Sequence, residues 1–334
     1  MLALRSRKSN KPGTATSRLR LFYCGDIHGS DVCFRKFINA GAHYGADVLI
    51  LGGDITGKAL VPIVRLDDGS RRGHLHGQER LCQTEEEVEQ LRQAIGRAGF
   101  YPVDVTAEEM ALMEASAEER GERFREAMIR QVRGWTELAG ERLRDSGRVC
   151  LVMPGNDDEY YIDEHLGGDE ASIVRNVDGA VVELANGVEV LSLAWSNQTP
   201  WASAREFTEE EIADRLGVLT GRLMRPESAI FNIHVPPYAS GIDTVQKLDA
   251  DFRPVVENGM PVEIPAGSTA VREAIERVQP LLGLHGHIHE SKGDVRIGRT
   301  LCVNPGSDYA SGRLHGVLLD VTPESIERHI FTEG

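Results

Sequence analysis

Five short polar segments, far apart in the sequence, each follow a largely apolar run that predicts a β-strand. The runs are Leu19–Cys24, Val48–Leu51, Val149–Met153, Ile230–Ile233 and Leu281–Leu284. The segments are Asp26-Ile27-His28, Gly52-Gly53-Asp54, Gly155-Asn156-Asp157-Asp158, His234 and Gly286-His287-Ile288-His289. In an open α/β sheet, ligands bind just outside the carboxyl ends of the strands. We therefore expect side chains from all five segments to converge on one site.

The side chains in these segments are of the types that hold metal ions. Residues i and i+2 of an extended segment point to the same side, so Asp26 and His28 can grip one ion, and His287 and His289 can do the same. The carboxylate of Asp54 has two oxygens and can bridge two cations. The remaining candidates are the amide oxygen of Asn156 and the imidazole of His234.

A mixed nitrogen and oxygen ligand set suits Mn, Fe, Zn, Ni or Co better than Ca or Mg, which prefer oxygen alone. The candidates are numerous enough for two such divalent ions. The pattern therefore predicts a dinuclear metallohydrolase. Any one of the motifs taken alone is better explained by a turn or a core histidine. The whole set, each member after a strand, is not.

The first predicted unit is β-α-β, with a helix over Asp31–Tyr44 between the strands that end at Cys24 and Leu51, as parallel strands require. Strands recur in the second half at Val181–Leu184, Val188–Ala194, Ile230–Ile233, Leu281–Leu284, Thr300–Val303 and Val317–Val321. Asn186-Gly187 is a hairpin signal. A helix is expected over Ser268–Val278 and a long loop over Ile242–Ile264. We predict an α/β/β/α sandwich.

Between the second and third polar segments the pattern changes, and residues from about Lys58 to Glu118 are expected to form an inserted cap. Leu60–Gln78 alternates like a β-hairpin. Capping boxes at Thr84–Glu87 and Thr106–Glu109 each predict a helix start. The second helical stretch is expected to run to about Ser146. Its last part carries apolar residues at helical spacing and should pack on the sheet as a crossover helix; these residues are Phe124, Met128, Val132, Trp135 and Leu138.

Composition argues against some classes of partner and location. A formal net charge of −15 argues against a polyanionic partner such as nucleic acid, whereas a small anionic substrate remains compatible once metal ions reverse the local field. The five cysteines are odd in number and lack CxxC spacing, which favours a reducing, cytoplasmic setting. No apolar stretch is long enough to cross a bilayer. Residues 1–18 are basic and polar and are expected to be a disordered tail before a domain over 19–334.

Over Leu19–Gly57 and about 148–307, the chain resembles the calcineurin-like metallophosphoesterase superfamily. The resemblance implies that Asp26, His28, Asp54 and His289 hold one metal, and that Asp54, Asn156, His234 and His287 hold the other. Asn304-Pro305-Gly306-Ser307 is similar to the family's late loop near the site, although a plain turn explains it about as well. The implied reaction is in-line displacement at phosphorus by a metal-bridged hydroxide.

The third segment departs from the family pattern, in which a histidine, the proton donor to the leaving group, follows the asparagine. Here Asp157 takes that position and Asp158 comes next. A carboxyl group beside two cations is ionised at neutral pH and is a poor acid. Asp157 and Asp158 are the catalytic candidates by position, with an orienting role also open to Asp158. The Gly-Asn-Asp variant looks like that of phosphoesterases related to the cyclic-nucleotide phosphodiesterase branch.

Three consequences of this departure stay open. The substrate is a diester or carries a leaving group of low pKa, another group such as His74 or His76 donates the proton, or the site binds and hardly turns over. The leading hypothesis is a phosphoesterase acting on a small phosphodiester or monoester. The alternatives are a metal-binding scaffold for interactions and, third, a nuclease, against which the acidic charge counts.

Overall fold

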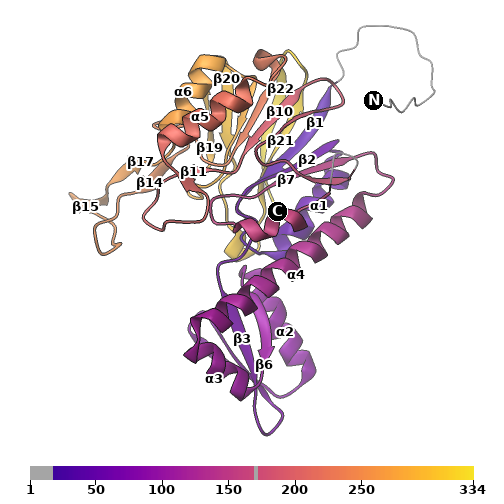
Figure 1. The fold of residues 1–334 in the computed structure, drawn as a ribbon, viewed down its shortest axis with the longest axis vertical. Helices are drawn as coiled ribbons and strands as arrows, with labels where there is room; N and C mark the ends of the chain where they lie inside the picture. The colour runs from indigo at the N-terminus through magenta and orange to yellow at the C-terminus, as the bar shows by residue number, and fades with distance from the viewer. Residues whose placement is uncertain (1–17, 169–171) are drawn as a thin grey trace.

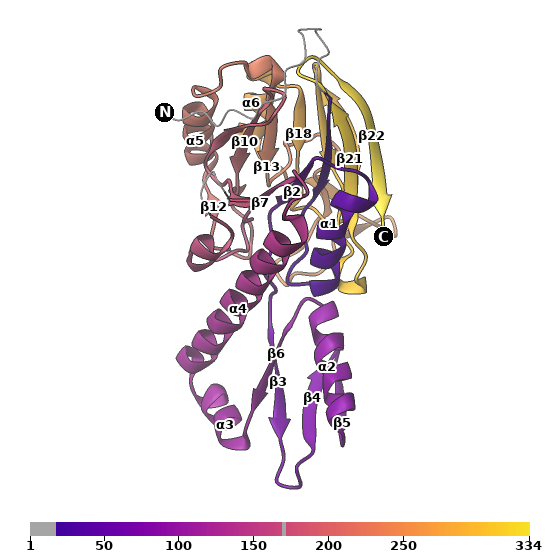
Figure 2. The same ribbon diagram turned by 90° about the vertical axis from the view of Figure 1, so that its right-hand side faces the viewer.

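The computed structural model of the chain describes residues 18–168 and 172–334. Two six-stranded sheets pack face to face with helices on their outer faces and form a sandwich (Figures 1 and 2). A smaller lobe projects from one end of this sandwich. The four-layer α/β/β/α architecture predicted from the sequence is confirmed. The expected tail falls outside the described residues except for Arg18. Within residues 18–168 and 172–334, no helix is long and apolar enough to cross a membrane.

The first sheet is built on four parallel strands in the order β1-β2-β7-β8, to which β21 and β22 add an antiparallel edge. Their bounds are β1 (Leu19–Cys24), β2 (Val48–Gly52), β7 (Val149–Met153), β8 (Val174–Asn176), β21 (His315–Val321) and β22 (Ile326–Glu333). Two helices cover its outer face, α1 (Asp31–His43) and α4 (Ala117–Leu143). The predicted packing of α4 on the sheet is confirmed, because Val132 and Trp135 share a core with Leu51 and Cys150. Trp135 also stacks on Phe34 of α1 with ring centroids 4.4 Å apart.

The second sheet has the order β19-β20-β18-β13-β10-β9, with its four central strands parallel. The bounds are β9 (Val181–Glu183), β10 (Glu189–Leu193), β13 (Ile230–Ile233), β18 (Leu282–Leu284), β19 (Gly293–Ile297) and β20 (Thr300–Asn304). Helices α5 (Glu209–Thr220) and α6 (Thr269–Val278) cover its outer face. The Asn186-Gly187 hairpin joins β9 to β10 as predicted. Helix α5, which begins at a Thr208 capping box, is not among the elements predicted from the sequence.

Alternate residues of the central strands pack into different hydrophobic cores. In β1, Leu21 and Tyr23 point into the layer between the two sheets, whereas Phe22 and Cys24 point toward α1 and α4. This follows from the two-residue period of a strand and explains why these strands are largely apolar on both faces. All five cysteines are buried and free; Cys82 lies in the core of the smaller lobe, and the other four lie in cores of the sandwich.

The smaller lobe, residues 60–115, is a four-stranded sheet in the order β5-β4-β3-β6 with α2 on one face and α3 on the other. The bounds are β3 (Leu60–Arg65), β4 (Arg71–Leu75), β5 (Gln78–Cys82), α2 (Glu85–Arg97), β6 (Tyr101–Val105) and α3 (Ala107–Ala115). The hairpin and both capping boxes lie where the sequence predicted them. Strands β5 and β6 were not predicted from the sequence.

Two expectations are wrong. The helical stretch after Thr106 is not continuous: Ser116 is extended and its side chain accepts a hydrogen bond from Glu119 N at 3.2 Å, so one helix ends and another begins there. Residues 242–264 are not a plain loop either. They form an arm with two short antiparallel ladders, β14 (Thr244–Gln246) with β17 (Glu263–Pro265) and β15 (Val256–Glu257) with β16 (Met260–Pro261). Asn258 and Gly259 both take positive φ angles at the tip, as a tight two-residue turn requires.

The remaining short elements lie in the connections. They are β11 (Ser196–Asn197), β12 (Glu206–Phe207) and the 3₁₀ helices η1 (Tyr160–His165), η2 (Pro226–Ser228) and η3 (Tyr309–Ser311). The segment between β11 and β12 approaches the carboxyl end of β7, where the backbone N–H of Arg205 donates to the carbonyl of Asn156. This contact links the connection to the predicted site.

Candidate metal centre

All candidate ligand residues lie just beyond the carboxyl ends of β1, β2, β7, β13 and β18. The glycines in these segments allow the loops to approach one another. A Cβ atom on Gly155 would collide with the carboxylate of Asp54, and one on Gly286 would collide with that of Asp26. The glycine preceding the ligand is therefore a steric requirement of both loops.

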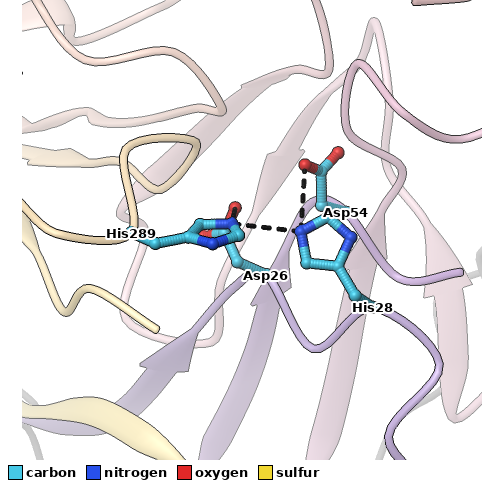
Figure 3. Close-up of side chains that lie close together, drawn as sticks. All are labelled: Asp26, His28, Asp54 and His289. Carbon is cyan, nitrogen blue, oxygen red and sulfur yellow. Dashed lines mark hydrogen bonds and ion pairs between the residues drawn. The ribbon is translucent and has the colours of Figure 1, made fainter. Parts of the chain in front are cut away.

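Four of the candidates form one compact group. Ligand atoms of Asp26, His28, Asp54 and His289 all lie within 4.8 Å of one another, and Figure 3 shows these side chains turned toward a common point. The Nε2 atoms of His28 and His289 are 3.0 Å apart. His289 Nε2 lies 3.4 Å from Asp26 Oδ1, and His28 Nε2 lies 3.5 Å from Asp54 Oδ2.

A second group contains Asp54, His234 and His287, whose ligand atoms also lie within 4.8 Å of one another. The amide oxygen of Asn156 lies within it, 3.1 Å from His234 Nε2 and 2.7 Å from His287 Nδ1. Asp54 faces both groups with different oxygens, since its Oδ1 is 3.3 Å from His234 Nε2 and its Oδ2 faces His28. The seven candidates are thus brought together as two groups that share one carboxylate.

Burial and mutual charge shift the pKa values of these groups. Burial raises the pKa of Asp54 to about 6. Burial alone would lower the pKa of His234, but the facing Asp54 carboxylate raises it to about 10. Burial lowers the pKa of His287 to about 3. Burial opposes ionisation of Asp26, yet the hydrogen bond to His289 holds its pKa well below the usual range. The facing carboxylates and imidazoles therefore shift one another's pKa values.

The backbone at the centre is held in an uncommon conformation. Asp26, His28, Asp54 and His287 all have positive φ angles, between 38° and 66°. Such angles are rare for residues other than glycine and cost free energy, so the surrounding structure must impose them. They cluster here at the ends of β1, β2 and β18, where they turn the four side chains into the centre.

Surrounding side chains fix the orientation of the candidate ligands. His234 Nδ1–H donates to the carbonyl of Gly52 at 3.0 Å, so Nε2 is the ring nitrogen that faces Asp54. Outer partners of this kind commonly fix the tautomer of metal-binding histidines. His285, also buried, donates from Nδ1 to the carbonyls of Ile233 and Val235 on either side of His234.

The Asn304-Pro305-Gly306-Ser307 segment lies against the same loops. Asn304 Nδ2 donates to the carbonyl of Ile288 at 2.9 Å, and the Ser307 hydroxyl donates to the carbonyl of Asp26 at 2.6 Å. The segment therefore braces the two loops that carry the first group. Tyr309, two residues after Ser307, packs its ring 4.7 Å from that of His28, measured between centroids.

Asp158 is turned away from both groups. Its fully buried carboxylate accepts backbone hydrogen bonds from Ile55 (2.9 Å), Thr56 (2.8 Å) and Gly155 (2.8 Å), and another from the Thr56 hydroxyl (2.5 Å). These contacts join the loop of Asp54 to that of Asn156. The expectation that Asp158 takes part in the reaction directly does not fit this geometry, whereas an orienting role does.

Asp157 lies beside the centre in a network that the sequence did not predict. Its Oδ2 is 2.6 Å from the ammonium of Lys58, its Oδ1 accepts from the Ser203 hydroxyl at 2.7 Å, and its backbone N–H donates to Asp54 Oδ1 at 3.1 Å. Burial would raise the pKa of Asp157, but the hydrogen bond from Lys58 lowers it to about 2. Asp157 is therefore an ionised hydrogen-bond acceptor.

The other proton-donor candidates lie in the smaller lobe. His74 pairs with Glu79 across the β4–β5 hairpin at 3.3 Å, and His76 packs against Phe100. Within the described residues, neither ring forms a hydrogen bond or ion pair with the centre. Lys58 is not among the residues predicted from the sequence, although the sequence holds a signal: it is the only lysine between Lys36 and Lys247, and it follows Asp54 by four residues.

The residues present fit divalent metal ions. The Oδ2 atom of Asp26 is buried and has no hydrogen-bond partner within the described part of the chain. The Nε2 atoms of His28 and His289 face the same point and lie 3.0 Å apart. Buried acceptors converging in this way are satisfied by a bound cation, so this cluster of Asp and His residues could bind metal.

Comparisons with known proteins agree with the fold. No family model matches the sequence. MJ1162 of Methanocaldococcus jannaschii, an uncharacterized protein, is 33% identical over 158 residues, which cover 46% of this chain and only 62% of that relative. The crystal structure of TT1561 from Thermus thermophilus aligns with a TM-score of 0.52 and 15% identity over 95% of this chain and 99% of that one. A second crystal structure aligns at 0.57 with the same identity and coverage. The chain therefore shares its overall α/β fold with these two structures.

Proposed function

We propose that this protein is a dinuclear metal-dependent phosphoesterase that hydrolyses a small phosphodiester or phosphomonoester. The observation that carries the proposal is that the two carboxylate oxygens of Asp54 face different groups of candidate ligands. Asp26, His28, Asp54 and His289 would hold one ion, and Asp54, Asn156, His234 and His287 the other. Bound ions would supply Lewis-acid chemistry, neutralising phosphoryl oxygens and lowering the pKa of water.

The mixed ligand set favours Mn, Fe, Zn, Ni or Co. The rest of the proposed chemistry belongs to residues beside the centre. The Lys58 ammonium, paired with Asp157, lies where it can donate hydrogen bonds to a phosphoryl or leaving-group oxygen. Ser203 and Lys58 hold the carboxylate of Asp157, which orients the ammonium.

The ionised state of Asp157 favours substrates that need little protonation of the leaving group, which are diesters or esters of acidic alcohols. Lys58 can stabilise a departing alkoxide by charge, whereas the Asp157 carboxylate would repel it. The proposal includes a role for residues 58–118 as a cap that selects the substrate. Lys58 lies in the connection between β2 and that lobe.

The test is hydrolysis of bis-p-nitrophenyl phosphate by metal-stripped protein, with and without added Mn²⁺. Metal-dependent release of p-nitrophenol supports the proposal, and a faster rate than with p-nitrophenyl phosphate supports the diester preference. The Asp54→Asn variant, folded by circular dichroism, should bind less Mn²⁺ and lose turnover. Asp67→Asn, on an exposed turn of the smaller lobe, is the matched control.

Binding of two metal ions with no turnover on a panel of phosphoesters would contradict the proposal. It would favour the alternative hypothesis, a metal-binding scaffold for interactions. Cleavage of single-stranded nucleic acid at physiological salt would favour the third hypothesis.

A further inference from the structure

A cavity of about 480 Å³ opens between the smaller lobe and helix α4. Its walls come from β3, α3 and the first half of α4, which lie together in Figures 1 and 2. Most of the side chains that line it are apolar; they include Leu60, Pro62, Met110, Met113 and Phe124. The volume lies within the range of small-molecule sites, roughly 300–1,000 Å³.

The cavity exists because two helices share one face of the lobe sheet without filling it. Met113 of α3 packs with Val64 and Val105 over part of that face. At Ser116 the chain turns into α4, which continues toward the sandwich. Leu60 and Phe124 are left only partly buried beside the gap. The apolar walls are therefore a consequence of the helix break.

The cavity wall is tied to the candidate metal centre. Phe124 packs edge-on against Tyr101 with ring centroids 5.6 Å apart. The Tyr101 hydroxyl in turn accepts a hydrogen bond from the backbone N–H of Gly57 at 2.8 Å. Gly57 directly precedes Lys58, so the lining aromatic residue and the site lysine are fixed by one short chain of contacts.

Lys58 connects the cavity to the candidate metal centre. It lines the cavity, and its ammonium lies 2.6 Å from Asp157, the neighbour of Asn156 in the centre. A phosphoester whose phosphoryl group lies at the centre would meet the Lys58 charge first and apolar walls beyond it. Arg120, also on the lining, donates to the carbonyl of Met113. The lining thus combines the Lys58 charge with mostly apolar surface.

We propose that this cavity is a substrate subsite that receives an apolar, ring-sized substituent of the phosphoester, such as an aryl group. The inference rests on the proposed phosphoesterase function and deepens it by assigning the class of substrate. An apolar ring that enters the cavity leaves water, and its burial supplies selectivity over esters with a small alkyl group.

The test compares binding of phenylphosphonate and methylphosphonate to the Mn²⁺-loaded full-length protein by titration calorimetry. Neither compound can be hydrolysed, so the readout is independent of turnover. Phenylphosphonate is expected to bind about tenfold to a hundredfold more tightly, from burial of one ring. Gly121→Leu should abolish this preference and leave methylphosphonate affinity unchanged, because Gly121 lines the cavity and a Cβ there meets open space.

Gly140→Leu is the matched control. Gly140 lies on the same helix, a Cβ there also meets nothing within 4 Å, and it does not line the cavity. Both substitutions replace glycine by a stronger helix former, so both variants should fold. Equal affinities for the two phosphonates in the unsubstituted protein, or a preference that survives Gly121→Leu, would overturn the subsite. Failure of both phosphonates to bind would instead count against the proposed function on which the subsite rests.

Discussion

The ammonium of Lys58 and the carboxylate of Asp157 lie 2.6 Å apart at the edge of the candidate metal centre, although 99 positions separate them in the sequence. Asp157 stands where the resemblance to metallophosphoesterases would place a histidine. Its partner supplies the positive charge that a protonated histidine would have brought. The pair therefore changes the proposed chemistry from proton donation to charge stabilisation.

Lys58→Met is expected to lower kcat/KM for bis-p-nitrophenyl phosphate by about a hundredfold to a thousandfold, the usual effect of removing one donor to developing charge. Lys58→Arg should retain part of the activity because it keeps the charge. Metal content, measured by mass spectrometry, should not change in either variant. Lys247→Met, on the exposed arm, is the control. Unaltered kinetics in Lys58→Met would show that the lysine serves only to tie the lobe to the sandwich.

Asp158→Asn is expected to destabilise the fold and weaken metal binding together. The carboxylate now accepts hydrogen bonds from backbone N–H groups. The NH₂ of an asparagine would face those N–H groups as a second donor. The lost hydrogen bonds cost about 1 to 3 kcal/mol in free energy of unfolding. Metal affinity should fall by about tenfold to a hundredfold because the Asp54 and Asn156 loops lose their shared brace. Urea unfolding and competition with a chelating dye measure the two effects. Asp67→Asn should change neither.

Arg205→Met is expected to cost about 3 kcal/mol in free energy of unfolding, because it leaves acceptors of a buried cation unpaired. The fully buried Arg205 donates to Asp163 at 2.6 Å and to the carbonyl of Asp158 at 2.7 Å. Arg205→Lys should recover only part of this loss, since an ammonium cannot reproduce the guanidinium fork. The measurement is urea unfolding, with Arg222→Met on the surface as the control. Equal free energies of unfolding for Arg205→Met, Arg205→Lys and Arg222→Met would show that the buried Arg205 contacts do not stabilise the fold.

Asp320 should make stability depend on pH in the acid range. Arg20 donates to it at 2.7 Å, and this hydrogen bond lowers the pKa of Asp320 below its usual value. The unfolded chain therefore takes up this proton first as pH falls below about 3.9. The stabilisation is complete above that value and is lost as pH falls through the lower pKa of the folded protein.

The Asp320→Asn variant tests this directly. Its free energy of unfolding should lie below that of the unsubstituted protein at neutral pH, and the difference should shrink toward pH 3. The exposed Asp251→Asn variant should follow the unsubstituted curve. A difference that stays constant from neutral pH to pH 3 would rule out the linkage.

Elements with local signals could be predicted from the sequence. The capping boxes at Thr84 and Thr106 and the Asn186-Gly187 turn lie as expected, because neighbouring residues satisfy them. Strand β6 carries no such signal. It pairs in parallel with β3 through partners such as Leu60 and Tyr101, about 40 positions apart, and short-range pattern does not reveal such a pairing.

What the sequence by itself determined is the fold class and the convergence of the candidate ligands, because each polar segment ends an apolar strand and parallel strands end at one edge. The tertiary structure alone decided which oxygen of Asp54 faces which group, that Asp158 turns inward, and that Lys58 reaches Asp157. These outcomes depend on how loops distant in sequence pack against one another. Hydrogen-bond geometry and burial at those contacts set the direction of each side chain, and neither is encoded in local spacing.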